Sequence, residues 1–318
     1  MDMSTLTRSA VLAALDWEAG TTVLSPEMGG PGSWVGGPSA VAHDGAIYLA
    51  YRLRRPVGEG RGYANVIART VDGVTLETLA VIDRDRHRAE SLERPCLVRM
   101  DEGKWRLYIS CATPNSKHWR VDLLEAEHIR DLPEAPPVTV LPGDDSVAVK
   151  DPVILRRDGV WHLWASCHPL DDPSATDRMT TEYATSPDGV KWNWQGTTLG
   201  GGDGWDRRGV RFAALLCLPD GLLALYDGRA TEGENWEERS GAADSDSPAG
   251  PWVRRPGPVF TSPYSTHGLR YLTAVHDPSG PLRVYYEGAR PDGSHELRTQ
   301  LLPPWSAPGR PADSSGRR

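Results

Sequence analysis

A short motif that recurs five times limits what this chain can fold into more than any other feature of its 318 residues. Each copy has a turn that contains a glycine, with a short apolar run before it and an alternating aromatic and aliphatic run after it, as in HDGAIYLAY from His43. A glycine between two such runs is a strong hairpin signal, because it adopts the positive φ that a tight turn requires. The turn glycines are Gly45, Gly103, Gly159, Gly221 and Gly280, which are spaced by 58, 56, 62 and 59 residues.

The remainder of each repeat predicts two further strands. Segments such as Thr181–Trp192 and Ala242–Trp252 have the pattern of a third strand, a turn and the start of a fourth. Four antiparallel strands per repeat are typical of propeller blades, which stack radially around an axis. We therefore expect an all-β fold, a five-bladed β-propeller whose four-stranded antiparallel blades surround a central channel. Helical patterns are confined to Ser4–Trp17 and Val121–Arg130.

The repeats divide the chain into an N-terminal segment, 1–20, a single propeller domain, 21–302, and a C-terminal tail, 303–318. The tail has the Pro, Gly, Ser and Arg bias of a disordered terminus. Residues Thr21–Pro26 precede the first repeat. We expect them to complete the sheet of the last blade, so that the ring closes without an exposed edge strand.

Composition and charge exclude several classes of protein. The formal net charge is −8, whereas a general nucleic-acid or anionic-membrane surface requires an excess of Lys and Arg. No apolar stretch approaches the roughly 20 residues of a membrane span, and residues 1–17 lack a signal-peptide cleavage pattern. The four cysteines are scattered, which predicts buried strand thiols rather than disulfides or a metal site. We expect a cytoplasmic protein that binds neither nucleic acid nor membrane, and the sequence leaves its oligomeric state open.

Five blades of this size, strands introduced by x-D-P or x-R-P tripeptides, and the turn sequence SPDGVKW together resemble the glycoside hydrolase propeller superfamily of families 32, 43, 68 and 130. The resemblance covers roughly residues 30–302. It implies that the first strand of each blade lines the central channel, and that the residues just before its apolar core project into the active site. In this sequence those residues are Trp34, Gly36, Gly37, Glu93, Arg94, Lys150, Asp151, Arg208, Arg211, His267 and Arg270.

Glycoside hydrolysis in these families requires two carboxyl groups, one as general acid and one as base or nucleophile. Asp151 is similar to the third-blade aspartate of family 43, which tunes the pKa of the acid. Where that family has the base aspartate this sequence has Gly37, and where it has the acid glutamate the sequence is R-G-V from Arg208, so the family 43 triad is incomplete. The resemblance then leaves Asp151 and Glu93 as the catalytic pair, although family 130 has E-D-P where this chain has E-R-P.

Positive charge gathers at the expected channel mouth of this acidic protein. Because the planar fork of arginine suits carboxylate and phosphate, this charge favours a substrate with an acidic group, or phosphate as a co-substrate. The alternative is that the cations pair with Glu93 and Asp151 and only hold the blades together. The cations are Arg94, Lys150, Arg208, Arg211 and Arg270.

Further residues near the expected mouth each have a functional and a structural interpretation. Trp34 is expected either to stack on a ring of the substrate or to pack near the axis. His267 is similar to the central histidine of the superfamily and is expected to orient a ligand, to coordinate a central ion or water, or to pack. Apart from such an ion, no cofactor or metal is indicated. Charges after two second strands either reach the mouth or are solvated loop charges: Asp227, Arg229, Glu287 and Arg290.

Two functions follow from these observations. The first is a glycoside hydrolase-like enzyme acting on a carbohydrate or glycosylated small molecule, with Asp151 and Glu93 moving protons and the cations holding an anionic group. The second keeps the scaffold without hydrolysis, and the pocket binds, isomerises or cyclises an acidic small molecule in a biosynthetic pathway. The substrate-binding residues in either case are Trp34, Arg94, Lys150, Arg208, Arg211, His267, Arg270 and Glu287.

Overall fold

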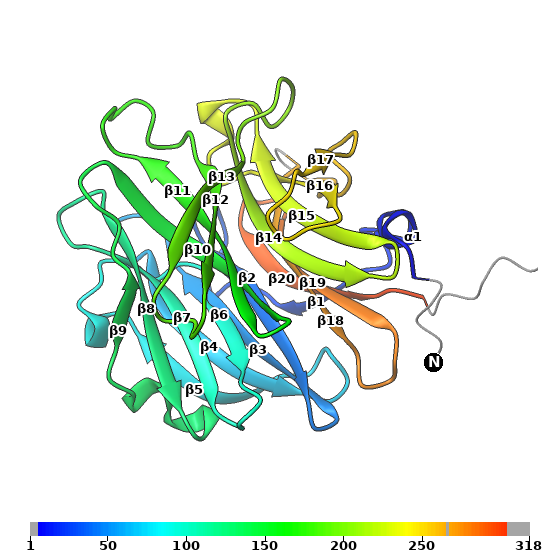
Figure 1. Ribbon diagram of the computed structural model, residues 1–318, viewed down its shortest axis with the longest axis horizontal. Coiled ribbons are helices and arrows are strands. Elements are labelled where there is room, and N and C mark those ends of the chain that lie inside the picture. The colour runs from blue at the N-terminus through cyan, green and yellow to red at the C-terminus, as the bar shows by residue number, and fades with distance from the viewer. Residues whose placement is uncertain (1–5, 265–266, 304–318) are drawn as a thin grey trace, which may run out of the picture.

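The computed structural model describes residues 6–264 and 267–303, and its regular structure is almost entirely β-strand. The strands form five four-stranded antiparallel units (Figure 1). Three units are separate sheets, and the first and last are joined through one parallel pair, Trp34 with His295. The expected disordered tail, 303–318, lies outside the described residues except for Pro303.

Each unit is formed by strands that follow one another in the sequence. Blade 1 comprises β2 (Trp34–His43), β3 (Ala46–Arg54), β4 (Gly62–Thr70) and β5 (Glu77–Asp83). Blade 2 comprises β6 (Cys96–Arg99), β7 (Trp105–Ala112), β8 (Trp119–Ala126) and β9 (Val138–Leu141). Blade 3 comprises β10 (Val147–Arg157), β11 (Val160–Pro169), β12 (Thr180–Ser186) and β13 (Asn193–Leu199). Blade 4 comprises β14 (Gly209–Leu218), β15 (Gly221–Arg229), β16 (Arg239–Ser245) and β17 (Val253–Arg254).

Blade 5 combines three strands from the end of the described chain with one from its beginning. It comprises β18 (Leu269–His276), β19 (Leu282–Ala289), β20 (His295–Leu301) and β1 (Thr21–Leu24). Strand β1 pairs antiparallel with β20, so Thr21 lies opposite Thr299. The prediction that Thr21–Pro26 completes the last blade is confirmed.

The five units form a closed ring. Their first strands contact one another in the order β2, β6, β10, β14 and β18, and β18 contacts β2. Figure 1 shows these strands around a common centre. The five-bladed propeller expected from the repeat is therefore the observed fold.

The turn glycines explain why the repeat was visible in the sequence. All five have positive φ, from +70° at Gly45 to +123° at Gly221, and each lies between the first and second strands of its blade. An L-residue at these positions is strained, whereas glycine is not. The predicted third strand, turn and fourth strand are also present in blade 3, where β12 ends at Ser186 and β13 begins at Asn193.

The two helical predictions have different outcomes. The N-terminal pattern forms α1 (Arg8–Ala14), whose first turn is capped by the Thr7 hydroxyl accepting from the Ala10 amide at 3.2 Å. The second helix is wrong, because Val121–Ala126 belongs to β8 and only Ile129–Glu134 forms a short 3₁₀-helix. Pairing of β8 with both β7 and β9 satisfies the backbone of this segment and overrides its local helical pattern.

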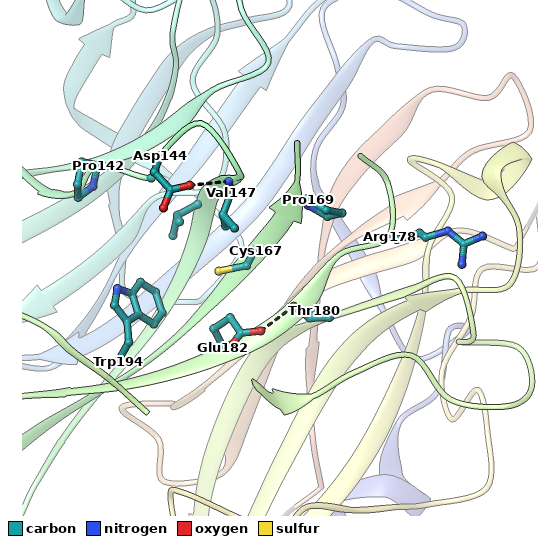
Figure 2. Close-up of a pocket in the computed structure, with 11 residues that line it drawn as sticks. Pro142, Asp144, Val147, Cys167, Pro169, Arg178, Thr180, Glu182 and Trp194 are labelled. Carbon is teal, nitrogen blue, oxygen red and sulfur yellow. Dashed lines mark hydrogen bonds between the residues drawn. The ribbon is translucent and has the colours of Figure 1, made fainter. Parts of the chain in front are cut away.

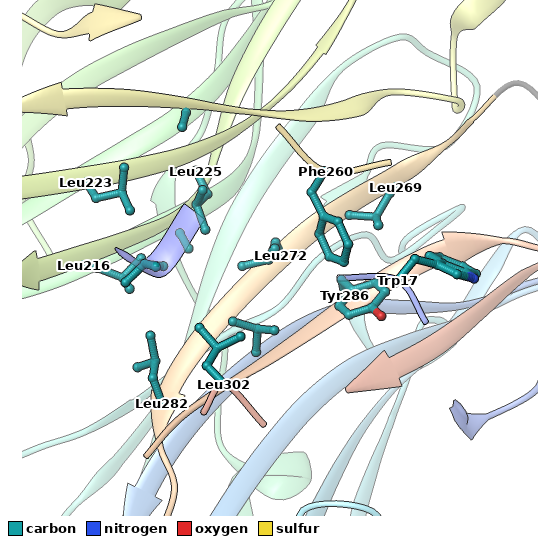
Figure 3. Packing of buried hydrophobic residues seen from close by; sticks show 14 residues of the cluster. Trp17, Leu216, Leu223, Leu225, Phe260, Leu269, Leu272, Leu282, Tyr286 and Leu302 are labelled. Atoms are coloured by element: carbon teal, nitrogen blue, oxygen red, sulfur yellow. The ribbon is translucent and has the colours of Figure 1, made fainter. Parts of the chain in front are cut away.

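The hydrophobic core consists of five clusters, and each lies between two neighbouring blades. The cluster between blades 4 and 5 also receives Val11 of α1 and Trp17, so the N-terminal segment packs on the ring (Figure 3). All four cysteines are free thiols. Cys96, Cys111 and Cys167 are buried as expected, but Cys217, near the outer end of β14, is exposed. No helix among the described residues is long and apolar enough to cross a membrane.

Candidate functional site

The inner strands of blades 1, 3 and 5 each contain a β-bulge, at Gly37, Asp151 and Tyr271 respectively. Their φ angles are +59°, +53° and +55°. Non-glycine residues keep such a conformation only where the surrounding structure enforces it, and they cluster at functional sites. The bulges bring two blades into contact, because the Tyr271 hydroxyl donates to Oδ2 of Asp151 at 3.4 Å.

Tyr271 closes the centre of the ring. Its side chain is almost fully buried, and burial raises the pKa of its hydroxyl to about 12. Four guanidinium groups surround the aromatic ring, an arrangement that cation–π attraction stabilises. Their distances from the ring centroid are 3.9 Å for Arg211, 5.1 Å for Arg270, 5.5 Å for Arg52 and 5.9 Å for Arg94.

Buried ion pairs link the blades around this tyrosine. Glu287 of β19 is fully buried, and it accepts hydrogen bonds from Arg52 of blade 1 and from Arg270 of its own blade, both at 2.8 Å. It also bonds Nδ1 of His295 at 2.9 Å. The other side of the Arg52 guanidinium contacts Glu93, which belongs to the segment before blade 2.

The network continues through blades 4 and 3. Glu238, next to β16, accepts from Arg270 at 2.9 Å and from Arg229 at 2.6 Å. Arg211 of β14 donates to Asp227 at 2.9 Å and lies 3.5 Å from Asp151. Ion pairs thus connect all five blades. In order around the ring they involve Glu93, Arg52, Glu287, Arg270, Glu238, Arg211 and Asp151. Of the cations predicted to pair with Glu93 and Asp151, only Lys150 and Arg211 do so, both with Asp151, and Glu93 pairs with Arg52 instead.

These contacts decide the protonation of Asp151, one of the two carboxyls that the resemblance makes catalytic. Burial alone would raise the pKa of Asp151, but Lys150 and Arg211 together hold that pKa below its ordinary value. Asp151 is therefore ionised at neutral pH, and its side chain has no exposed surface. Glu93 is held by Arg52. A carboxylate that is ionised and buried, as Asp151 is, is poorly suited to donate a proton to a leaving group.

A polar cavity of about 290 Å³ opens beside this network. Glu93 and Lys150 both line it, together with residues of blades 1, 2, 3 and 4. Among its lining side chains are two aromatic ones, Trp119 and Trp236, and the imidazole of His168. Burial lowers the pKa of His168 to about 3, so that ring is neutral near pH 7.

Two largely buried cations that line the cavity have no carboxylate within hydrogen-bond distance among the described residues. Lys150 is 13% exposed at its side chain, and its ammonium lies 3.7 Å from Asp151, beyond hydrogen-bond distance. Arg54 is 3% exposed and donates one hydrogen bond, to the Gly32 carbonyl at 3.0 Å. It makes no ion pair with any residue that the structure describes, and its Nε has no hydrogen-bond partner there. Burial lowers the pKa of Lys150 to about 8 and that of Arg54 to about 9.

The structure gathers most of the residues nominated from the sequence, and it separates two of them. Arg208 is bound in bidentate fashion by Asp177, with both contacts at 2.7 Å, and does not line the cavity. His267 is exposed, and its Nδ1 bonds the Ser262 carbonyl at 2.9 Å. Their own neighbours hold both side chains away from the network, Asp177 in the case of Arg208 and the Ser262 carbonyl in the case of His267. The residues gathered at the network or cavity are Trp34, Glu93, Arg94, Lys150, Asp151, Arg211, Arg270 and Glu287.

The site also contains residues that the sequence analysis did not identify. Most come from second strands or from the segments that follow them, Trp119 and His295 begin third strands, and Tyr271 belongs to the inner strand β18. Asp227, Arg229 and Glu287 are at most 1% exposed, so the solvated-loop interpretation is wrong for them, and of that set only Arg290 keeps appreciable exposure. The additional residues are Arg52, Arg54, Trp119, His168, Trp236, Glu238, Tyr271 and His295.

A larger cavity, of about 550 Å³, lies away from the axis at the junction of blades 2 and 3 (Figure 2). Its wall is mainly apolar, and Trp194 and Arg178 lie at opposite ends of it. Its two carboxylates already have partners, since Glu182 accepts from two threonine hydroxyls and Asp144 from nearby backbone amides. Because its carboxylates are engaged in local hydrogen bonds and its wall is mainly apolar, the central cavity is the candidate site.

Solved structures resemble this chain in fold. A thermostable family-43 glycoside hydrolase matches with a TM-score of 0.67 at 14% identity, covering 92% of this chain and 99% of that one. The GH43_1 enzyme from Xanthomonas citri complexed with xylotriose matches with a TM-score of 0.63 at 17% identity, covering 92% of each chain. This chain therefore shares the propeller fold of these glycoside hydrolase structures. No protein-family model matches the sequence, and no curated protein matches it.

A solved structure from a second glycoside hydrolase family also resembles this chain in fold. A member of the GH130 family, described as mannoside phosphorylases that contain glycoside hydrolases targeting beta-1,2 mannosidic linkages in Candida mannan, matches with a TM-score of 0.58 at 15% identity. That match covers 88% of each chain. At these identities the likeness establishes the scaffold, and the chemistry has to be argued from the site itself. Within the described residues, no group of three or more His, Cys, Asp or Glu side chains is arranged to hold a metal ion.

Proposed function

We propose that the central cavity binds an acidic small molecule and that the reaction, if the ligand is transformed, is an isomerisation or cyclisation rather than glycoside hydrolysis. The observation that carries this proposal is a pair of incompletely neutralised cations in the cavity wall: Arg54 makes no ion pair with any described residue, and Lys150 shares Asp151 with Arg211. A buried cation that is not fully neutralised is unfavourable by itself, and an anionic ligand supplies the missing charge.

The size and walls of the cavity fit a ligand with one ring. A volume of about 290 Å³ suits a compact molecule of sugar size. Trp119 and Trp236 offer aromatic surface beside the two cations, since Lys150 lies 4.8 Å from the Trp119 ring and Arg54 lies 5.3 Å from that of Trp236. A sugar acid or a cyclic organic acid satisfies both the charge and the ring surfaces.

Lys150 is the residue to which we assign proton transfer. A group with a pKa of about 8 gains and loses a proton close to neutral pH, as general acid and base catalysis requires. Its side chain lines the cavity, whereas Asp151 lies buried behind it.

The competing function, glycoside hydrolysis, is supported by the scaffold and by Glu93 at the cavity wall.

Thermal denaturation with glucuronate and with methyl glucoside as its neutral counterpart tests the proposal. A ligand that binds only the folded state, at a hundred times its Kd, adds about 2.7 kcal/mol to the free energy of unfolding. We expect glucuronate, and not methyl glucoside, to raise Tm, and Lys150→Met to remove the shift. Lys191→Met changes an exposed lysine and should leave it intact. The absence of a shift with glucuronate and related ring acids would contradict the proposal.

A panel of aryl glycosides separates the two functions. We expect no release of the aryl group by the wild-type protein. Turnover that Asp151→Asn abolishes would instead establish hydrolysis by the carboxyl pair and overturn the non-hydrolytic assignment.

The affinity for glucuronate should also depend on pH. Lys150 carries its positive charge below its pKa of about 8 and loses it above, so the association constant should be largest below pH 8 and fall about tenfold for each further pH unit. Isothermal titration at pH 7, 8 and 9 measures this. Lys150→Arg keeps its proton throughout, because the ordinary pKa of arginine is above 12, and should show a much smaller decrease. An equal decrease in both proteins would show that another group titrates.

A further inference from the structure

Arg54 and Lys150 occupy different parts of the cavity wall. Arg54 is the last residue of β3 in blade 1, and Lys150 belongs to β10 in blade 3, with blade 2 between them. Each lies against its own tryptophan, since Arg54 packs 3.9 Å from the Trp34 ring and Lys150 lies over Trp119. The two cations thus belong to different blades and lie against different tryptophans within one cavity.

Neither position is fully neutralised from within the protein, because Lys150 shares Asp151 with Arg211, at 3.7 and 3.5 Å, and Arg54 makes no ion pair with any described residue. The neighbours that act on Arg54 most strongly after burial are Arg52 and Arg270, which are cations and lower its pKa. Arg52 and Arg270 are themselves occupied by Glu287, at 2.8 Å each. The carboxylates near the cavity are therefore committed to other partners, and Arg54 keeps an unpaired Nε although 97% of its surface is buried.

Two other cations on the cavity wall differ from Arg54 and Lys150 because each has a close carboxylate partner. Arg61 is paired with Glu90 at 2.9 Å, and Arg229 with Glu238 at 2.6 Å. Because those cations already have carboxylate partners, they contribute little net charge to a ligand. The positions that a ligand can neutralise most favourably are Arg54 and Lys150.

We infer that the ligand of the central cavity carries two acidic groups, one held by Arg54 and the other by Lys150. This inference rests on the proposed function and narrows it to a class, the dicarboxylic or otherwise doubly anionic small molecules of about six carbons. A guanidinium fork suits a carboxylate in bidentate geometry, and an ammonium suits a point contact, so the two ends of the ligand are recognised differently.

Gluconate and glucarate form a matched pair of probes, since they share a six-carbon chain and differ in having one or two carboxylates. We expect isothermal titration with the full-length protein to give a Kd for glucarate that is at least about tenfold lower than for gluconate. Arg54→Leu should raise the Kd for glucarate to about that of gluconate, and Lys150→Met should do the same. Arg86→Leu alters an exposed arginine that is paired with Glu134 and should change neither Kd.

A second readout does not depend on any ligand. Because the Arg54 charge is buried without a carboxylate, Arg54→Leu should raise the Tm of the free protein while it weakens glucarate binding. If Arg54 only supported Trp34 and Trp236, its removal would instead lower Tm, and that result would count against a ligand-binding role.

The two proposals fail in different ways. If gluconate binds as tightly as glucarate, and each single variant abolishes gluconate binding, the cations form one site for one acidic group; the inference is then wrong and the proposed function stands. If neither acid binds and glucuronate does not raise Tm either, the proposed function itself is wrong.

Discussion

Replacement of Glu287 by glutamine should lower the free energy of unfolding by about 3–5 kcal/mol at pH 7. Glu287 is fully buried and is bonded by Arg52, Arg270 and His295. The amide has nearly the same shape but no charge, so two buried guanidinium groups each lose one of the two carboxylates that compensate their desolvation. Chemical denaturation monitored by tryptophan fluorescence measures the change.

The matched control for this variant is Glu27→Gln. Glu27 pairs with Arg55 at 2.8 Å, but both side chains are well exposed, and such pairs contribute at most about 1 kcal/mol. Equal losses for the two variants would show that the network at the axis does not hold the blades together.

The difference between wild type and Glu287→Gln should also depend on pH. The first effect on Glu287 is burial, which would raise its pKa, but Arg270 and Arg52 reverse this and hold the pKa well below the ordinary value. The carboxylate therefore contributes its stability above the unfolded-state pKa of about 4.3 and loses it as the pH falls below that value. We expect the difference in unfolding free energy to shrink below pH 4.

Removal of residues 1–24 should destabilise the protein more than any single substitution in that segment. The deletion uncovers the edge of β20 and takes Val11 and Trp17 out of the cluster between blades 4 and 5. Trp17→Ala alone should lower the free energy of unfolding by about 3–5 kcal/mol, because the ring is 9% exposed and packs against Tyr286 and Arg298. Thermal and chemical denaturation of the two variants gives the comparison.

Trp194→Ala is the control for Trp17→Ala, because its side chain is 45% exposed on the edge strand β13. We expect a change within about 0.5 kcal/mol for this surface substitution. A deletion variant as stable as the wild-type protein would mean that the N-terminal segment covers the ring without supporting it.

The fold could be predicted because its information is local and repeated. Each turn glycine sits where only a residue that tolerates positive φ is unstrained, so the five hairpins are marked directly in the sequence. The helix expected at Val121–Arg130 was wrong because pairing with strands on both sides is a tertiary effect that a local pattern does not contain. The site depends on tertiary geometry in the same way.

The site could be predicted only in part, because two geometric features were not available from the sequence. The bulges at Asp151 and Tyr271 set which inner-strand residue faces the axis, so counting back from the strand placed Arg208 and His267 too near the centre. The second strands also contribute buried residues to the site, although in the sequence their charged residues resemble those of solvated loops. The repeat does mark these positions. The residue seven positions after each turn glycine, or six in blade 4, is buried near the axis: Arg52, Ser110, Ser166, Asp227 and Glu287.

The pairing of β1 with β20 has a consequence for biosynthesis. Thr21 is made nearly 280 residues before its partner Thr299, so strand β1 has no pairing partner until β20 has left the ribosome. Contacts this distant in sequence form slowly, and until they form the edge of β20 and the apolar surface under α1 are open to other chains. The interval between synthesis and ring closure is therefore when this protein is most exposed to aggregation.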